Sequence, residues 1–99
     1  MKNILIFTAH ERTNITSIFL ESFSLVNSYS NYYTDVILLD TSKDQLNNIF
    51  INTNYSFKIH YLFLGDSYWW CSAMRFGITW MLNNFTADFR FTMANDDLK

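Results

Sequence analysis

Residues 59–97 decide the fold, because the stretch IHYLFLGDSYWWCSAMRFGITWMLNNFTADFRFTMANDD contains a strand, a helix and a second strand in succession. Its first part, Ile59–Leu64, is an apolar run that predicts a buried strand. Residues 89–94 alternate apolar and polar side chains, as a strand with one buried face does. Between the two strands, apolar side chains recur every three or four positions, which predicts a helix with one buried stripe. That stripe consists of Trp70, Ala73, Met74, Gly77, Ile78 and Met81.

The first part of the chain shows the same alternation of strand and helix. Ile4–Thr8 and Val36–Leu39 are continuous apolar runs, typical of strands that are covered on both faces. A helix is predicted between them, with Thr13 or Asn14 as its N-cap. We expect the stripe that faces the sheet to consist of Ile15, Ile18, Phe19, Phe23 and Val26.

A weaker helical pattern covers Thr41–Thr53, where Leu46, Ile49 and Phe50 would face inward. With this segment included, strands and helices alternate along the whole chain. The alternation predicts an α/β fold with a mostly parallel four-stranded sheet and flanking helices, a Rossmann-like arrangement. Because 99 residues suffice for one domain at most, we expect a single domain over residues 1–99.

Composition excludes several classes of function. Hydrophobic residues make up 49% of the chain and aromatic residues 19%, which is too many for a disordered protein. The net charge of −2 disfavours binding to nucleic acid. A single cysteine, Cys71, excludes an internal disulfide. No apolar segment is long enough for a signal peptide or a membrane span, so we expect a cytoplasmic protein, free or at the inner face of the membrane.

The turn after the first strand excludes two kinds of nucleotide site. Dinucleotide-binding and P-loop proteins need a glycine-rich turn there, so that the backbone can approach phosphate groups. The corresponding turn here, Ala9–Thr13, contains no glycine.

Acidic residues follow two of the predicted strands. Asp40 ends the second strand, with Ser42 and Asp44 close behind, and Asp96 and Asp97 follow the fourth. In a doubly wound sheet, the carboxyl ends of the strands line one crevice, and ligands bind there. Carboxylates in such a crevice suit Mg²⁺ or Mn²⁺ bound to a phosphorylated ligand. Two other interpretations remain open: the first group caps a helix, and the last two acids form a solvated chain end.

Four segments of the chain also stand in a suggestive order: Thr8–Arg12, Asp40–Asp44, Gly65–Arg75 and Asn95–Asp97. They resemble, in the same order, the motifs of family 2 glycosyltransferases with the GT-A fold. The bacterial members that look closest have a Thr-x-His-Asn-Arg start, an Asp-Gly-Ser-x-Asp segment, a Gly-Asp-Gly…Trp…Gly-Met-Arg segment and an Asn-Asp-Asp motif. The resemblance covers nearly the whole chain.

This resemblance implies an enzyme that transfers a sugar from a nucleoside diphosphate sugar to a saccharide or lipid-linked acceptor, in surface polysaccharide synthesis. It implies Mn²⁺ or Mg²⁺ as a cofactor, with Asp97 as the metal ligand. The metal would bridge the diphosphate oxygens and stabilise the charge of the departing nucleotide. The resemblance assigns nucleotide contacts to Ala9, Glu11, Asp40, Arg75 and Asp96, and among them Asp40 would recognise the base or the ribose.

The chain departs from the family pattern at several positions. Glu11 stands where the family has asparagine, which puts a carboxylate near the pyrophosphate. Thr41, Ser67 and Ala73 stand where the family has glycine. Family catalytic domains are more than twice as long as this chain, and their second half supplies the acceptor site and the general base. We therefore assign no catalytic residue and expect the donor-binding part of a transferase.

Two other functions fit the same residues. The first is a nonenzymatic nucleotide-binding α/β module. The second is an interaction fragment, because a sheet with uncovered apolar surface favours self-association or a partner.

Overall fold

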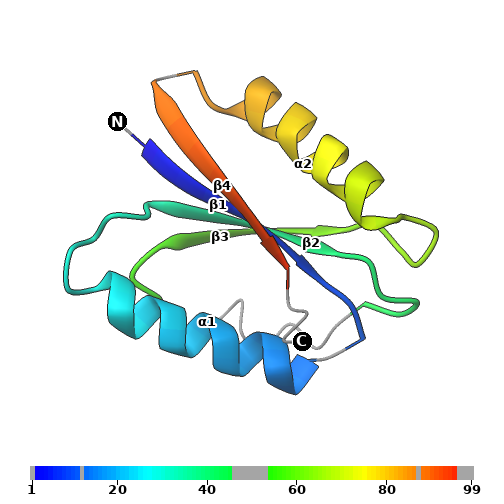
Figure 1. The fold of residues 1–99 in the computed structure, drawn as a ribbon, viewed down its shortest axis with the longest axis horizontal. Helices are drawn as coiled ribbons and strands as arrows, with labels where there is room; N and C mark the ends of the chain where they lie inside the picture. Colours follow the sequence, from blue (N-terminus) through cyan, green and yellow to red (C-terminus); the bar gives the residue numbers. More distant parts are fainter. Residues whose placement is uncertain (1, 12, 46–53, 87, 96–99) are drawn as a thin grey trace.

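The computed structural model describes residues 2–11, 13–45, 54–86 and 88–95, and its elements form three layers (Figure 1). A sheet of four parallel strands lies between two helices, one on each face, which confirms the predicted α/β fold (Figure 1). The strand order in the sheet is β3-β2-β1-β4. The elements along the chain are β1 (Lys2–Ala9), α1 (Thr13–Asn27), β2 (Asp35–Asp40), β3 (Lys58–Phe63), α2 (Trp70–Asn84) and β4 (Phe89–Asn95).

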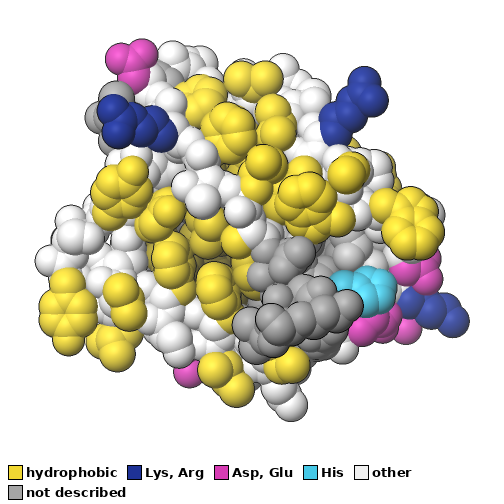
Figure 2. Space-filling model, viewed as in Figure 1, with side chains coloured by type: hydrophobic (Ala, Val, Ile, Leu, Met, Phe, Trp, Pro, Cys, Tyr) yellow, Lys and Arg dark blue, Asp and Glu magenta, His cyan; other side chains and the backbone are white. Residues whose placement is uncertain are grey.

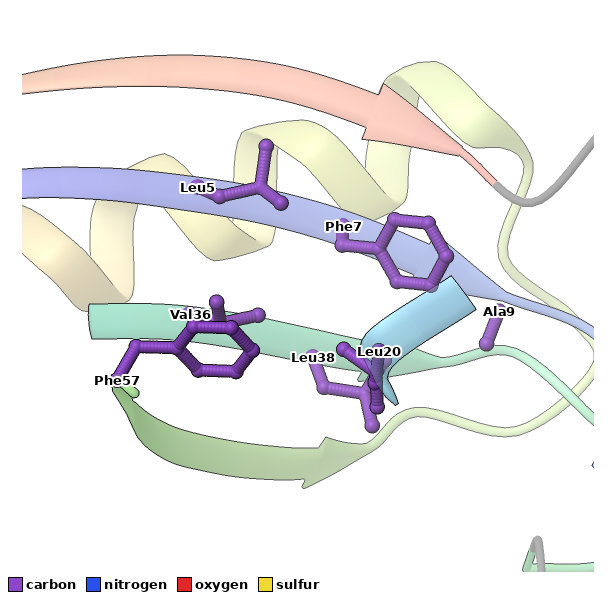
Figure 3. Close-up of a cluster of buried hydrophobic side chains, with 7 residues drawn as sticks. All are labelled: Leu5, Phe7, Ala9, Leu20, Val36, Leu38 and Phe57. Atoms are coloured by element: carbon purple, nitrogen blue, oxygen red, sulfur yellow. The ribbon is translucent and has the colours of Figure 1, made fainter. Parts of the chain in front are cut away.

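The two central strands, β1 and β2, are buried on both faces, as their continuous apolar runs predict. Because side chains alternate along a strand, each strand contributes to two cores. One set of side chains packs under α1 together with Leu20 and Phe57, and Figure 3 shows this cluster: Leu5, Phe7, Ala9, Leu20, Val36, Leu38 and Phe57. The opposite set packs under α2: Ile4, Ile6, Ile37, Leu39, Ala73, Met74 and Met81.

Helix α1 presents a different stripe to the sheet from the one that its apolar residues predict. Ile18 and Val26, both expected inward, are 63% and 67% exposed, whereas Thr16, Leu20 and Asn27 are buried. Phe19 and Phe23, also expected inward, do pack against the core. The helix is rotated so that two polar residues take core positions.

Asn27 explains part of this rotation, because its side chain is held by hydrogen bonds at the end of α1. Its amide nitrogen donates to the Tyr33 carbonyl at 3.0 Å and to the Ser56 hydroxyl at 3.0 Å. Its amide oxygen accepts from the Tyr33 N–H at 2.8 Å. A buried amide with its donors and acceptor satisfied is compatible with a core position, and it ties α1 to the turn before β2.

Helix α2 lies close against the sheet at Gly77. A Cβ atom at this position would lie 2.8 Å from Leu39 Cδ1 and 3.0 Å from Ile6 Cγ2. Only a residue without a side chain allows this approach. The predicted stripe is confirmed at Ala73, Met74, Gly77 and Met81, which are buried, whereas Trp70 is 44% exposed.

The connection from β2 to β3 is described in part. Thr41–Gln45, the start of the predicted weak helix, is not helical. Leu46, Ile49 and Phe50, which were expected to face inward, lie outside the described residues. The connection returns to the sheet on the α1 side, where Phe57 joins the core and the rings of Tyr55 and Phe57 stack with centroids 5.3 Å apart.

Candidate functional site

The strand order creates a switch point between β1 and β4. The chain passes from β1 to β2 and β3 on one side, then crosses to β4 on the other side of β1. The register sets Ala9 beside Asp40 of β2 and Thr8 beside Asn95 of β4. Open α/β sheets bind their ligands at such a point, outside the carboxyl ends of the strands. The turn at 9–11 is therefore flanked by the ends of β2 and β4.

Glu11 shapes the turn that follows β1. Its backbone is in the left-handed region, with φ of 56°, which costs a residue other than glycine roughly 1–2 kcal/mol. Its N–H donates to the Ser42 hydroxyl at 2.6 Å, and its carboxylate accepts from the Lys43 N–H at 3.2 Å. These two bonds hold the strained residue against the loop after β2. The predicted nucleotide-contacting residue Glu11 thus lies at the switch point, with its carboxylate bonded to the neighbouring loop.

His10 joins the same two loops. Its Nδ1 lies 2.8 Å from the Thr41 carbonyl oxygen and 3.3 Å from the Thr41 hydroxyl. Because a carbonyl only accepts hydrogen bonds, Nδ1 carries a proton, and in the neutral ring Nε2 is then the acceptor nitrogen. The histidine is exposed at the carboxyl edge of the sheet, next to the predicted contact Ala9, which is buried.

Asp40 lies beneath these loops and is fully buried. One carboxylate oxygen accepts from the Ser42 N–H at 3.0 Å, and the other accepts from the Tyr61 hydroxyl. Its carbonyl accepts from the N–H groups of Leu64 and Gly65, at 2.8 and 3.3 Å. In this arrangement Asp40 fixes the loops after β2 and β3. A direct contact with a base or ribose, as the family resemblance implies, requires these loops to open, because Asp40 is fully buried.

Arg75 and the terminal acids stand apart from these loops. Arg75 is exposed on α2, between Met74, which is buried against the sheet, and Phe76. Within the described part of the chain it makes no hydrogen bond or ion pair. Asp96 and Asp97, the predicted nucleotide contact and metal ligand, lie outside the described residues. The register nevertheless brings the backbone of Asn95, the residue before them, alongside Thr8.

No group of three or more His, Cys, Asp or Glu side chains within residues 2–11, 13–45, 54–86 and 88–95 could hold a metal ion. That search does not include Asp96 or Asp97. Sequence reasoning also missed the role of Tyr61 as a donor to Asp40. Tyr61 lies inside a predicted strand and pairs with Leu38 in the structure. The sequence pattern does not indicate that its hydroxyl reaches Asp40, at the end of the neighbouring strand.

A second group of titratable side chains lies at the opposite, amino end of the strands. The buried Asp35 carboxylate accepts from His60 Nε2 at 2.7 Å and from Lys2 Nζ at 3.3 Å. The His60 ring packs against Trp80 and Phe85, with ring centroids 5.3 and 5.5 Å away. This end of the sheet carries the amino ends of the strands, so the group stabilises the sheet rather than facing the switch point.

The pKa of Asp35 reflects two opposing effects. Burial alone raises the pKa, because it penalises the charged form. Hydrogen bonds from His60, Thr34 and Lys2, together with the positive charge of Lys2, outweigh burial and hold the pKa below its ordinary value of 3.8. The carboxylate is therefore ionised at neutral pH.

Comparison of the chain with protein-family models, curated proteins and solved structures finds no match. Neither helix in the described part of the chain is long and apolar enough to cross a bilayer.

Proposed function

We propose that this chain binds a nucleoside diphosphate sugar at the switch point between β1 and β4, as the donor-binding part of a glycosyltransferase. The observation that carries the proposal is the register of β1 with β4, which sets Asn95 beside Thr8. Asp96 and Asp97 follow Asn95 in the sequence, and the family resemblance assigns them to the same nucleotide site as Ala9 and Glu11. Thr8 and Asn95, one residue from each of two segments that resemble family motifs, are thus neighbours at the place where α/β sheets bind nucleotides.

The residue types of the segment Asn95–Asp97 suit a divalent cation that carries a diphosphate. Asn95, Asp96 and Asp97 offer oxygen donors, which Mg²⁺ and Mn²⁺ prefer. A bound metal would neutralise diphosphate charge and supply Lewis-acid stabilisation of the leaving nucleotide. The ordered loops at 9–11 and 40–43, fixed to each other by Glu11 and Ser42, would form the wall against which the nucleotide lies.

We also propose that the acceptor of the sugar is a saccharide or lipid-linked chain in surface polysaccharide synthesis. We assign no general base to any residue, so binding of the donor and transfer of the sugar are separate claims. Metal-dependent binding without turnover would favour the nonenzymatic nucleotide-binding module.

The test is calorimetric titration of the chain with uridine, thymidine and guanosine diphosphates, with and without Mn²⁺. We expect binding that requires Mn²⁺ and that weakens in Asp97→Asn by at least the roughly 10- to 100-fold that the loss of an outer-shell partner costs. Asp88→Asn is the matched control, because it removes an exposed carboxylate at the amino end of β4, away from the switch point. Binding that is absent from a folded sample, or equal in the two variants, would refute the proposal.

A further inference from the structure

Strand β4 is an edge of the sheet, and its outer side presents unpaired backbone groups. The Lys2 N–H donates to the Asp88 carbonyl at 3.1 Å, so the backbone groups of Asp88 face β1. Along a strand, these groups point to alternate sides. The N–H and C=O groups of Phe89, Phe91, Met93 and Asn95 therefore point away from β1, and no strand in the described part of the chain pairs with them.

The face that carries this edge is apolar. In Figure 2, hydrophobic side chains spread from α2 across the sheet to α1 on the side where Figure 1 shows β4 in front. Phe91 and Met93 of β4 are 42% and 44% exposed. The segment 89–95 contains no proline or lysine, which proteins use to protect exposed edges, and its one charged residue is Arg90. An apolar edge with so little protection favours the addition of another strand.

We propose that this edge pairs with β4 of a second copy of the chain, antiparallel and about a two-fold axis at Thr92. The two sheets then form one continuous eight-stranded sheet. This register pairs every residue of β4: Phe91 lies opposite Met93 of the other copy, Arg90 opposite Ala94 and Phe89 opposite Asn95. The proposal shares Asn95 with the nucleotide site but does not rest on the proposed function, because its test needs no nucleotide.

Backbone geometry supports this register. Phe91 and Met93 both direct their N–H and C=O groups outward, and antiparallel strands bond through such residues when they lie opposite each other. The exposed side chains of the same two residues then pack against each other across the strands. Apolar pairs of this kind each contribute roughly 0.2–1 kcal/mol.

The distribution of charge along β4 supports a second copy as the partner. Like charges directly opposite each other destabilise a pair of strands, and this register places Arg90, the charged residue of β4, opposite alanine. An axis at Arg90 would instead place the two copies of Arg90 opposite each other and leave four residues of each β4 strand, Thr92–Asn95, without a partner in the other β4.

Sedimentation velocity over a range of protein concentrations tests the association. We expect the wild type to form a particle of twice the 11.8 kDa monomer mass. Met93→Lys should be monomeric, because it replaces the methionine of each Phe91–Met93 pair with a charged residue. Ile18→Lys is the matched control, since Ile18 is an exposed apolar residue on α1, 63% exposed, and it should remain dimeric. Circular dichroism establishes that each variant is folded.

Disulfide cross-linking tests the register. In the proposed pairing, the two copies of Thr92 face each other at a position without direct hydrogen bonds, where Cα atoms lie about 4.5 Å apart. That separation is within the range for a disulfide. In a Cys71→Ser background, Thr92→Cys should therefore give a covalent dimer on mild oxidation. Arg90→Cys is the control: the two copies of residue 90 lie four strand positions apart, roughly 13 Å, and should not cross-link.

Each other outcome overturns the proposal. A wild type that stays monomeric at all concentrations excludes the association. A Met93→Lys variant that is still dimeric places the interface elsewhere. Equal cross-linking at positions 90 and 92 excludes the two-fold register. Particles that grow beyond the dimer indicate a head-to-tail contact, such as β4 on β3, which does not close.

Discussion

Asp35 and Asp40 begin and end the same buried strand, yet their carboxylates have different surroundings. Asp35 faces two basic side chains, His60 and Lys2, at the amino end of the sheet. Asp40 accepts from neutral donors, the Ser42 N–H and the Tyr61 hydroxyl, at the carboxyl end. The first carboxylate stabilises the fold through charge, whereas the second fixes the loops of the candidate site.

The pKa of Asp35 predicts how stability depends on pH. Because its folded-state pKa lies below 3.8, the unfolded chain takes up this proton first as the pH falls. Its contribution is therefore complete at neutral pH and is lost as the pH drops below about 4, through the folded-state pKa. Urea unfolding of the wild type should show a free energy of unfolding that falls over this range.

Asp35→Asn isolates this effect. At pH 7 we expect the free energy of unfolding to fall by about 1–3 kcal/mol. The substitution removes the negative charge and replaces one of the two acceptor oxygens, which bond His60 and Lys2, with an amide nitrogen that donates. The difference from the wild type should narrow below about pH 4, where the wild type also loses the charge. Asp44→Asn, at an exposed position, serves as the control. A variant with the same pH dependence as the wild type would contradict the assigned role of Asp35.

The acids of the candidate site show what the sequence reveals at the scale of single residues. The topology implied by the predicted strands placed Asp40 at a strand end, and the structure has it there. The direction of its side chain was not predictable, because it depends on Tyr61, a residue 21 positions away on another strand. The left-handed backbone of Glu11 likewise depends on Ser42, which lies across the sheet edge.

At the scale of elements, burial on both faces made β1 and β2 the most predictable parts of the chain. The interior of a strand that is covered on both sides is a continuous apolar run, and Ile4–Phe7 and Val36–Leu39 are such runs. Helix α1 was predicted in place but not in rotation. Its sequence contains more apolar residues than one face can hold, and the hydrogen bonds of Asn27 with Tyr33 and Ser56 favour a polar residue in the core.

The contact of α2 with the sheet predicts the effect of Gly77→Ala. A helical alanine gains about 1 kcal/mol over glycine in propensity, but the new Cβ would lie 2.8 Å from Leu39 and 3.0 Å from Ile6, both buried in the core. Overpacking of this kind costs about 1–3 kcal/mol. We expect a net loss of about 1 kcal/mol in urea unfolding. Thr79→Ala, at an exposed position of the same helix, is the control and should not destabilise the fold; a stabilised Gly77→Ala would show that α2 lies further from the sheet.

At the scale of the whole molecule, the alternation of strands and helices predicted a parallel sheet, but not which strand would lie at each edge. The handedness of crossover connections restricts the strand order without fixing it. The crossing from β3 to β4 creates both the switch point and the exposed edge. The candidate site and the proposed interface therefore follow from the same topological step.

Ligand binding at the switch point should stabilise the entire fold, because β1 and β4 both contribute to the central sheet. At a nucleotide concentration 100 times the dissociation constant, the gain is about 2.7 kcal/mol. For a domain of this size, that gain raises the Tm by about 10–20 °C. Thermal unfolding with nucleoside diphosphate and Mn²⁺, monitored by circular dichroism, measures the shift. Asp97→Asn should show a smaller shift under the same conditions, because binding that is roughly 10- to 100-fold weaker leaves a gain of only about 0.4–1.4 kcal/mol. A shift of equal size in that variant would contradict the assigned metal ligand.

The position of β1 between β2 and β4 has a consequence for how the protein emerges from the ribosome. β1 is translated before the other strands, and β2 follows soon after. The strand on the other side of β1 is β4, which begins only at Phe89. At 5–20 residues per second, synthesis from the end of β2 to the end of β4 takes roughly 3–11 s. During that interval one edge of the central strand β1 has no neighbouring strand. Chaperones or other nascent chains can bind this unpaired edge until β4 is synthesised and pairs with β1.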